Sequence, residues 1–206
     1  SAAPAPVPTR VEWQPAGRIL SRNDSPDVPF ESSVNPYRGC EHGCIYCYAR
    51  PTHAYLDLSP GLDFETRLVA KDGAVDALRR ELSRPGYRPQ PVNLGSATDA
   101  YQPVERELGL TRRIVELFDE TSHPFTVVSK SAGILRDLPL YERLARRRLV
   151  TVFISLTTLD PGLSRRLEPR AASGARRLQV IRALADAGVW VGLNVAPVIP
   201  FLNEPE

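Results

Sequence analysis

The sequence of 206 residues predicts an α/β fold built on a parallel sheet. Two observations support this prediction. From residue 32 onward, short apolar stretches alternate with amphipathic segments of helical periodicity. Short polar sets then follow the apolar stretches at their carboxyl ends. Strands that alternate with helices of roughly 10–15 residues are typical of right-handed βαβ units, in which the strands lie parallel.

Five short apolar stretches are the expected core strands. The stretch at 149–156 is strongly strand-like, and the one at 125–129 is rich in β-branched residues. An alternating segment at 64–70 predicts one further extended piece outside this set. The five core strands are expected at 33–37, 91–95, 125–129, 149–156 and 189–196.

Four amphipathic segments between these strands predict helices. Asp72, Thr111 and Ser173 are the expected N-terminal caps of three of them, because short polar side chains accept hydrogen bonds from free helix amides. The fourth helix is expected over 133–147, and Gly188 is expected to end the last one. The inward-facing residues at helical spacing are Ala74, Val75, Leu78 and Leu82, then Ile114, Leu117 and Phe118, then Leu135, Leu138, Tyr141 and Leu144, and finally Leu178, Ile181 and Leu184.

The distribution of proline divides the chain into a Pro-rich N-terminal arm over 1–30 and a core domain over 31–206. We expect the arm to be extended and disordered.

No apolar run approaches the roughly 18 residues that a membrane helix needs, so no membrane partner is expected. The net charge of +2 carries no strong signal for a polyanionic partner. Clustered unpaired thiols without a signal-peptide pattern predict a cytoplasmic protein.

All three cysteines of the chain, Cys40, Cys44 and Cys47, lie within eight residues in a Cys-x3-Cys-x2-Cys pattern. Three thiolates at this spacing can bind three irons of a cubic iron–sulfur cluster and leave the fourth iron without a protein ligand. An odd number of cysteines argues against a disulfide framework. A structural zinc site is the alternative, with His42 or His53 as the fourth ligand.

The predicted topology places the cysteine run at the active face of the sheet. Sheets of this kind keep their chemistry at the carboxyl ends of the strands. The cysteines follow the first strand, so they fall on that side, together with polar sets after the four later strands. These sets are residues 95–99, 129–131, 155–158 and 194–200.

The cysteine run, with Tyr46 before its last cysteine, resembles the signature of the radical S-adenosylmethionine (radical SAM) enzymes. The order of elements agrees with that family over 32–206. Further motifs resemble an uncharacterised bacterial branch related to spore photoproduct lyase. The resemblance implies a partial, TIM-like (β/α)6 barrel that is truncated at its C-terminal end, because five strands are found where the family has six. The motifs are Asn35-Pro36-Tyr37-Arg38-Gly39, Tyr48-Ala49-Arg50, Thr98-Asp99-Ala100-Tyr101-Gln102-Pro103 and Leu167-Glu168-Pro169-Arg170.

The resemblance also implies a function. The three cysteines would bind a 4Fe–4S cluster whose open iron is chelated by S-adenosylmethionine. Reductive cleavage would then produce methionine and a 5′-deoxyadenosyl radical that abstracts hydrogen from an unknown substrate. A reductase or a flavodoxin- or ferredoxin-type protein would donate the electron. A nucleic acid is one candidate substrate, as in a DNA-repair lyase, and a zinc- or cluster-binding module is the alternative of another class.

The family's S-adenosylmethionine contacts carry over to ten positions. The stretch after the second core strand is expected to meet the methionyl amine, and a guanidinium is expected to meet the carboxylate. Polar groups at the end of the fourth strand would bind the ribose, and the backbone after the fifth strand would bind the adenine. These cofactor-binding residues are Gly95, Ser96, Thr98 and Asp99, then Arg170, then Ser155 and Thr157, then Asn194 and Val198, with Tyr46 also lining the adenine.

The sequence departs from the related lyase in one respect. That lyase uses an additional cysteine as hydrogen donor, and this chain has no cysteine beyond the three of the run. Its repair reaction is therefore not expected here unless Tyr101 replaces the thiol or another segment supplies one. We interpret His42 and His53 as hydrogen-bonding or solvated residues. Lys130 either meets a substrate anion or covers the mouth of the barrel.

Overall fold

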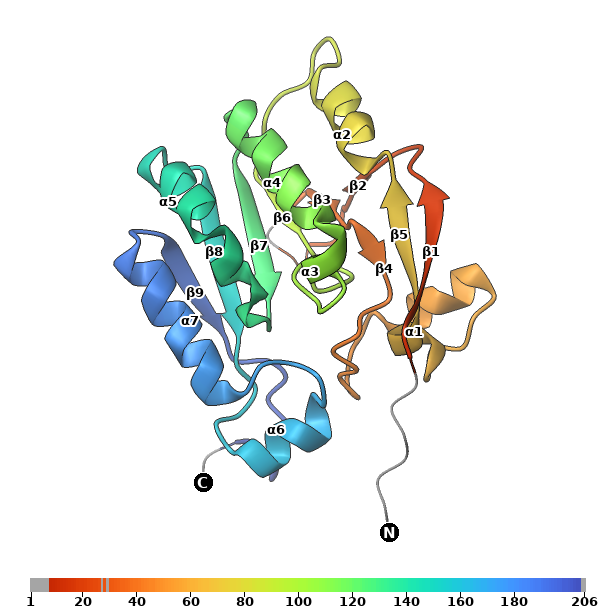
Figure 1. Cartoon of the computed structure of the whole chain (residues 1–206), viewed down its shortest axis with the longest axis vertical. Helices are drawn as coiled ribbons and strands as arrows, with labels where there is room; N and C mark the ends of the chain where they lie inside the picture. Colours follow the sequence, from red (N-terminus) through yellow and green to blue (C-terminus); the bar gives the residue numbers. More distant parts are fainter. Residues whose placement is uncertain (1–7, 27, 29, 205–206) are drawn as a thin grey trace.

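The computed structural model describes residues 8–26, 28 and 30–204 and shows a six-stranded sheet covered by helices (Figure 1). The order in the sheet is β2-β3-β6-β7-β8-β9. The strands β3, β6, β7, β8 and β9 run parallel, and β2 is antiparallel to β3. The α/β prediction is therefore confirmed. The strands are β2 (Leu20–Arg22), β3 (Ser32–Val34), β6 (Val92–Leu94), β7 (Phe125–Ser129), β8 (Val150–Ser155) and β9 (Trp190–Asn194).

The first core strand ends earlier than the sequence predicts. We expected residues 33–37, but β3 stops at Val34, and Tyr37–Arg38 forms β4 in a second sheet. The chain leaves the first sheet because Pro36 has no amide hydrogen to donate to a ladder. The Asn35 side chain bonds instead to the loop after β6.

The second sheet has three strands in the order β1-β5-β4, formed by β1 (Arg10–Pro15), β5 (Arg67–Asp72) and β4 (Tyr37–Arg38). β1 pairs in parallel with β5 along its whole length, so the expectation of a disordered arm is wrong for this part of residues 1–30. Residues 1–7, 27 and 29 of the arm lie outside the described residues. The predicted extended piece at 64–70 is confirmed from Arg67 onward, where β5 begins, whereas its first three residues belong to the short helix α1 (Asp63–Thr66).

The predicted helices form, although two of their caps are wrong. Ser173 does cap the last long helix by accepting a hydrogen bond from the Arg176 amide. At Asp72 and Thr111 the caps are instead Gly73 and Gly109, which adopt positive φ angles of 65° and 60° that favour glycine. The helices and 3-10 turns are η1 (Arg50–Leu56), α2 (Ala74–Leu82), α3 (Glu105–Leu108), α4 (Leu110–Glu120), η2 (Ala132–Asp137), α5 (Leu138–Arg146), α6 (Pro161–Leu167) and α7 (Gly174–Asp186).

The expected helix over 133–147 is split into η2 and α5. Pro139 lies in the first turn of α5, where a missing amide hydrogen costs nothing. α4, α5 and α7 lie along one face of the larger sheet (Figure 1). Their apolar sides pack on the strands, for example where Phe118 of α4 stacks on Phe125 of β7 with ring centres 4.8 Å apart. In the described part of the chain, no helix is long and apolar enough to cross a membrane.

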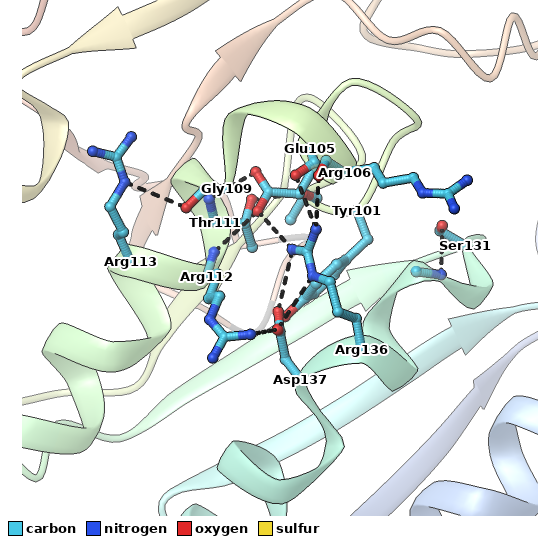
Figure 2. Close-up of polar contacts among 12 residues, drawn as sticks. Tyr101, Glu105, Arg106, Gly109, Thr111, Arg112, Arg113, Ser131, Arg136 and Asp137 are labelled. Atoms are coloured by element: carbon cyan, nitrogen blue, oxygen red, sulfur yellow. Dashed lines mark hydrogen bonds and ion pairs between the residues drawn. The ribbon is translucent and has the colours of Figure 1, made fainter.

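Two buried carboxylates join the helices on the outer side of the sheet (Figure 2). Glu105 accepts hydrogen bonds from the Tyr37 hydroxyl, the Thr111 amide at 2.8 Å and Arg136 Nη2 at 3.1 Å. Asp137 accepts bonds from Arg112 Nη1 at 3.0 Å and from the Tyr101 hydroxyl at 3.1 Å. Both carboxylates are at most 1% exposed, so the network ties α3, α4 and η2 to β4.

We predict that Glu105→Ala destabilises the protein far more than Glu107→Ala, its exposed neighbour on α3. Removing the Glu105 carboxylate leaves the buried Tyr37 hydroxyl and the Thr111 amide without this acceptor, and Arg136 keeps only its contacts with Asp137 and backbone carbonyls. The expected loss in the free energy of unfolding is about 3–5 kcal/mol for Glu105→Ala and about 0.5 kcal/mol or less for the control. Urea unfolding followed by circular dichroism measures both, and equal losses would contradict the role of the network.

Candidate functional site

The cysteine loop, residues 39–49 between β4 and η1, is held in place by its neighbours. The Cys40 amide donates to the Phe64 carbonyl at 2.9 Å, and the Ile45 amide donates to the Leu167 carbonyl at 3.0 Å. Cys40 and Cys44 are both 7% exposed, and Cys47 is half-buried. The three thiols are therefore presented from a sheltered loop rather than from the open surface.

The outer side of the loop is closed by an ion pair. Arg170 Nη2 lies 2.5 Å from Glu65 Oε2, and Arg170 Nε donates to the Glu41 carbonyl of the loop. A Cβ atom at Gly43, whose φ is +65°, would overlap Glu65 Oε2. The predicted contact of Arg170 with a methionyl carboxylate gains no support, because the guanidinium already has a carboxylate partner within the protein.

The segment after β6 lies against the cysteine loop, as the sequence predicts. Gly95 turns the chain with φ +90°, and the next two residues are held by the Asn35 side chain, which donates to Ser96 Oγ and accepts from the Ala97 amide. The Thr98 hydroxyl donates to the Gly39 carbonyl at 2.7 Å. Thr98 therefore ties the two loops together, and its contact with a methionyl amine stays a prediction.

Asp99 and His42 form a buried ion pair between the two loops. His42 Nδ1 lies 3.2 Å from Asp99 Oδ2, and Asp99 also accepts bonds from the Ser129 hydroxyl at 2.8 Å and the Lys130 amide at 2.6 Å. Burial alone would lower the pKa of His42, but the Asp99 carboxylate and the Cys40 sulfur raise this pKa to about 10. Burial would raise the pKa of Asp99, but His42 and the hydrogen bonds lower it to about 2. The carboxylate thus connects the loop to the ends of β6 and β7.

Glu168 makes the corresponding connection to β8. Its carboxylate accepts hydrogen bonds from the Tyr46 hydroxyl, from Thr157 Oγ1 at 2.9 Å and from Arg177 Nη2. Glu168 and Arg177 are each 1% exposed at the side chain. The predicted site residues Tyr46 and Thr157 are thus brought together, with their hydroxyls 2.9 Å apart. Tyr46 is anchored by its hydroxyl, and the contact of its ring with an adenine stays a prediction.

The remaining predicted residues lie at the ends of β8 and β9. Ser155 is buried, and its carbonyl accepts a bond from Arg177 Nη1 at 2.9 Å. The Asn194 carbonyl accepts from the Leu156 amide at 2.9 Å, while Val198 lies further out and is 55% exposed. The strand ends therefore converge as expected, and the roles of these residues toward ribose and adenine stay predictions.

Lys130 is one of the cations near the thiols, together with His42 and Arg50. Its ammonium lies 5.9 Å from the centre of the Tyr46 ring. Burial raises the pKa of the Cys44 thiol to about 12, and the Lys130 charge opposes this shift. The same two effects act on the pKa of Cys47, where burial again dominates. Lys130, unlike Arg170, has no carboxylate within ion-pair distance in the described part of the chain, although its charge helps to lower the pKa of Glu168.

The donor set fits an iron–sulfur cluster by its chemistry. The three thiols are unpaired, and each of Cys44 and Cys47 feels the charge of Cys40. Iron would replace thiol protons that burial otherwise retains. Among the described residues, no three Cys, His, Asp or Glu side chains are already gathered as a metal site. His42 faces Asp99, and His53 Nε2 bonds to the Arg67 carbonyl at 2.9 Å, so both histidines have partners other than a metal.

Sequence reasoning assigned no role to Glu168 or Arg177. The arginine is nevertheless visible in the pattern of α7, because it lies three and seven residues before Val180 and Leu184 on the buried face. An arginine at an apolar helical position indicates a buried charge that needs a partner. Glu168 belongs to a motif quoted above, but the identity of its partner could not be read from the local sequence.

A family model of the radical SAM superfamily matches residues 34–206. The chain belongs to the radical SAM superfamily. This match includes the cysteine loop, all five parallel strands except the first two residues of β3, and the loops that meet at their carboxyl ends. It places the chain among the radical SAM enzymes and confirms the resemblance found in its motifs.

Curated proteins and solved structures show the same relationship. An uncharacterized protein of Mycobacterium tuberculosis, Rv2578c, is 41% identical over 177 residues, which are 86% of this chain and 52% of that protein. A structure of spore photoproduct lyase complexed with dinucleoside spore photoproduct matches with a TM-score of 0.68 at 17% identity, over 92% of this chain and 51% of the lyase. A double mutant of that lyase with bound AdoMet and dinucleoside spore photoproduct matches with a TM-score of 0.64 at 18% identity, over 91% and 51%. The chain thus spans about half the length of these proteins, and the lyase structures show a shared fold.

We predict that Asp99 stabilises the protein in a pH-dependent way. Because folding lowers its pKa from the ordinary 3.8 to about 2, the stabilisation is present above about pH 4 and is lost as the pH falls toward 2. The free energy of unfolding of Asp99→Asn should therefore lie below that of the unmodified protein at neutral pH and approach it in acid. Asp76→Asn, exposed on α2, is the control. A difference that does not change with pH would contradict this assignment.

Proposed function

We propose that the cysteine loop binds a 4Fe–4S cluster and that the chain provides the S-adenosylmethionine-cleaving core of a radical SAM enzyme. The observation that carries this proposal is the arrangement of three sheltered thiols beside the Lys130 ammonium, at the carboxyl ends of parallel strands. When bound, the cluster would supply the electron that cleaves S-adenosylmethionine to methionine and a 5′-deoxyadenosyl radical.

The protein's own contribution is to hold and shelter this site. Cys40, Cys44 and Cys47 would bind the iron, and the Asp99–His42 and Glu168–Tyr46 contacts fix the loop against the sheet. A fixed loop limits the reorganisation that electron transfer would otherwise require and restricts the access of water. We further propose that the parallel strands form part of a (β/α)6 barrel whose free edge lies at β9.

We assign the predicted carboxylate contact to Lys130 in place of Arg170. A methionyl carboxylate held beside the thiols would approach the Lys130 ammonium, which has no carboxylate partner among the described residues. Arg170 lies on the outer side of the loop and is bound to Glu65. Residues 95–99, with Ser155, Thr157, Asn194 and Val198, then remain the proposed surroundings of the amine, ribose and adenine.

A lyase-like reaction on nucleic acid is a second candidate, because solved structures of spore photoproduct lyase are among those that match the fold. One finding bears on it. The Tyr101 hydroxyl is bound to Asp137 and lies 2.9 Å from the Tyr141 hydroxyl, and Tyr101 is 2% exposed. Tyr101 therefore does not replace the missing cysteine as a hydrogen donor at the cluster. An anaerobic assay that detects loss of thymine dimers from irradiated DNA tests this candidate.

We predict that anaerobic reconstitution yields about four irons per chain and that dithionite with S-adenosylmethionine then produces 5′-deoxyadenosine. Cys47→Ala should lose iron and produce no 5′-deoxyadenosine. Ser83→Ala, at the exposed residue that directly follows α2, should match the unmodified protein. Iron analysis and chromatography of the products measure both. One tightly bound zinc without cleavage would favour a structural metal module instead.

We also predict that Lys130→Met weakens the binding of S-adenosylmethionine to the cluster-loaded protein by about tenfold, because a charged hydrogen bond is lost. Arg170→Gln should bind within about threefold of the unmodified protein once its iron content is taken into account. Equilibrium dialysis gives both constants. Weaker binding in Arg170→Gln alone would return the carboxylate contact to that residue.

A further inference from the structure

A cavity of about 250 Å³ lies at the second sheet, away from the thiol side chains. It is enclosed by the end of β1, the turn that follows it, and the outer face of β4 and β5. In Figure 1 this sheet stands at the opposite side of the molecule from β9 and α7. Arg18, Arg38 and Lys71 line the cavity together with the polar residues Gln14 and Ser21.

The strand register explains why the cations meet there. Arg38 pairs with Val69, and Lys71 follows Val69 by two residues, so the three side chains share one face of the sheet. The opposite face carries Leu68 and Ala70, which belong to the core. Arg18 then reaches the same cavity from the turn after β1.

In the part of the chain that the structure describes, these three cations lack an acidic partner. Among the residues that the structure describes, Arg18, Arg38 and Lys71 form no ion pair and no side-chain hydrogen bond, and no acidic residue lines the cavity. Two carboxylates in this region are engaged elsewhere, namely Glu81, whose charge acts on Lys71, and Glu12, which pairs with Val69. Glu81 accepts from the Ile19 amide at 2.7 Å, and Glu12 lies 3.4 Å from Arg67.

The lowered pKa of Lys71 agrees with a cavity whose positive charges are not neutralised by nearby carboxylates. Burial and, to a smaller extent, the Arg38 charge together lower the pKa of Lys71 to about 8, and Glu81 only partly opposes them. Concentrating positive charge without a counter-ion costs free energy that a bound anion would recover. Guanidinium groups match the oxygens of phosphate in pairs, and a lysine adds a point charge.

We propose that this cavity is a binding site for a phosphate group, held by Arg18, Arg38 and Lys71. The phosphate belongs either to a small ester or free phosphate, or to the backbone of a nucleic acid. The proposal does not rest on the proposed radical chemistry, because Arg18, Arg38 and Lys71 are neither the proposed iron ligands nor the proposed S-adenosylmethionine residues.

Isothermal titration of the cluster-reconstituted protein with inorganic phosphate, at constant ionic strength, tests the site. We expect saturable binding that weakens by about tenfold or more in Lys71→Met and in Arg38→Gln. Lys71→Arg should restore binding to within about threefold, because it keeps the charge. Arg182→Gln on α7 removes an exposed arginine far from the cavity and should bind as the unmodified protein does. Circular dichroism verifies that each variant is folded.

A second probe, a short single-stranded DNA, distinguishes the two sources of phosphate. If inorganic phosphate displaces the DNA, and if Lys71→Met no longer binds DNA, the site is assigned to a nucleic-acid backbone. Binding of inorganic phosphate without DNA would assign it to free phosphate or a small ester. The proposal is overturned if the unmodified protein shows no saturable phosphate binding, or if Arg38→Gln and Lys71→Met bind phosphate as tightly as Arg182→Gln. None of these readouts requires cleavage of S-adenosylmethionine, so the outcome is separate from that of the proposed function.

Discussion

The cysteine loop contains no helix or strand over residues 39–49, and the organisation of the site follows from this constraint. Backbone and polar groups of a buried loop must find hydrogen-bond partners outside it. Here the partners come from separate parts of the fold, namely the Phe64 carbonyl, the Asp99 carboxylate after β6 and the Glu168 carboxylate after α6. The parallel sheet brings these groups to one edge, so the sheet determines where the thiols lie.

Much of the fold could be predicted from local patterns, and the failures have physical causes. The five parallel strands and the Ser173 cap were visible in apolar runs and a single polar residue. The caps expected at Asp72 and Thr111 failed because a glycine one or two residues away adopts a positive φ and caps the helix instead. The pairing of β1 with β5 joins distant segments, and such a contact leaves no periodic signal in either of them.

The candidate site, like the fold, could be predicted from the sequence only in part. The cysteine spacing predicts the role of the thiols, and Tyr46 and Thr157 were both expected to contact S-adenosylmethionine on the active face. What the sequence did not show is which polar groups satisfy each other. Arg170 was expected to bind a carboxylate, and it does bind one, but that carboxylate belongs to Glu65. The chemical preference of a side chain was thus readable from its type, whereas its partner depended on the tertiary arrangement.

Tyr37 sets a limit on how this chain can vary in length. Its ring is buried in the core, its hydroxyl reaches Glu105, and its backbone pairs with Ala70, so its position in β4 is determined at three points. Cys40 is fixed by the Phe64 carbonyl only three residues later. One inserted residue between them would turn alternate side chains to the opposite face or pull the first thiol away from the others. The short connection can therefore accept some changes of side chain but no change in the number of residues.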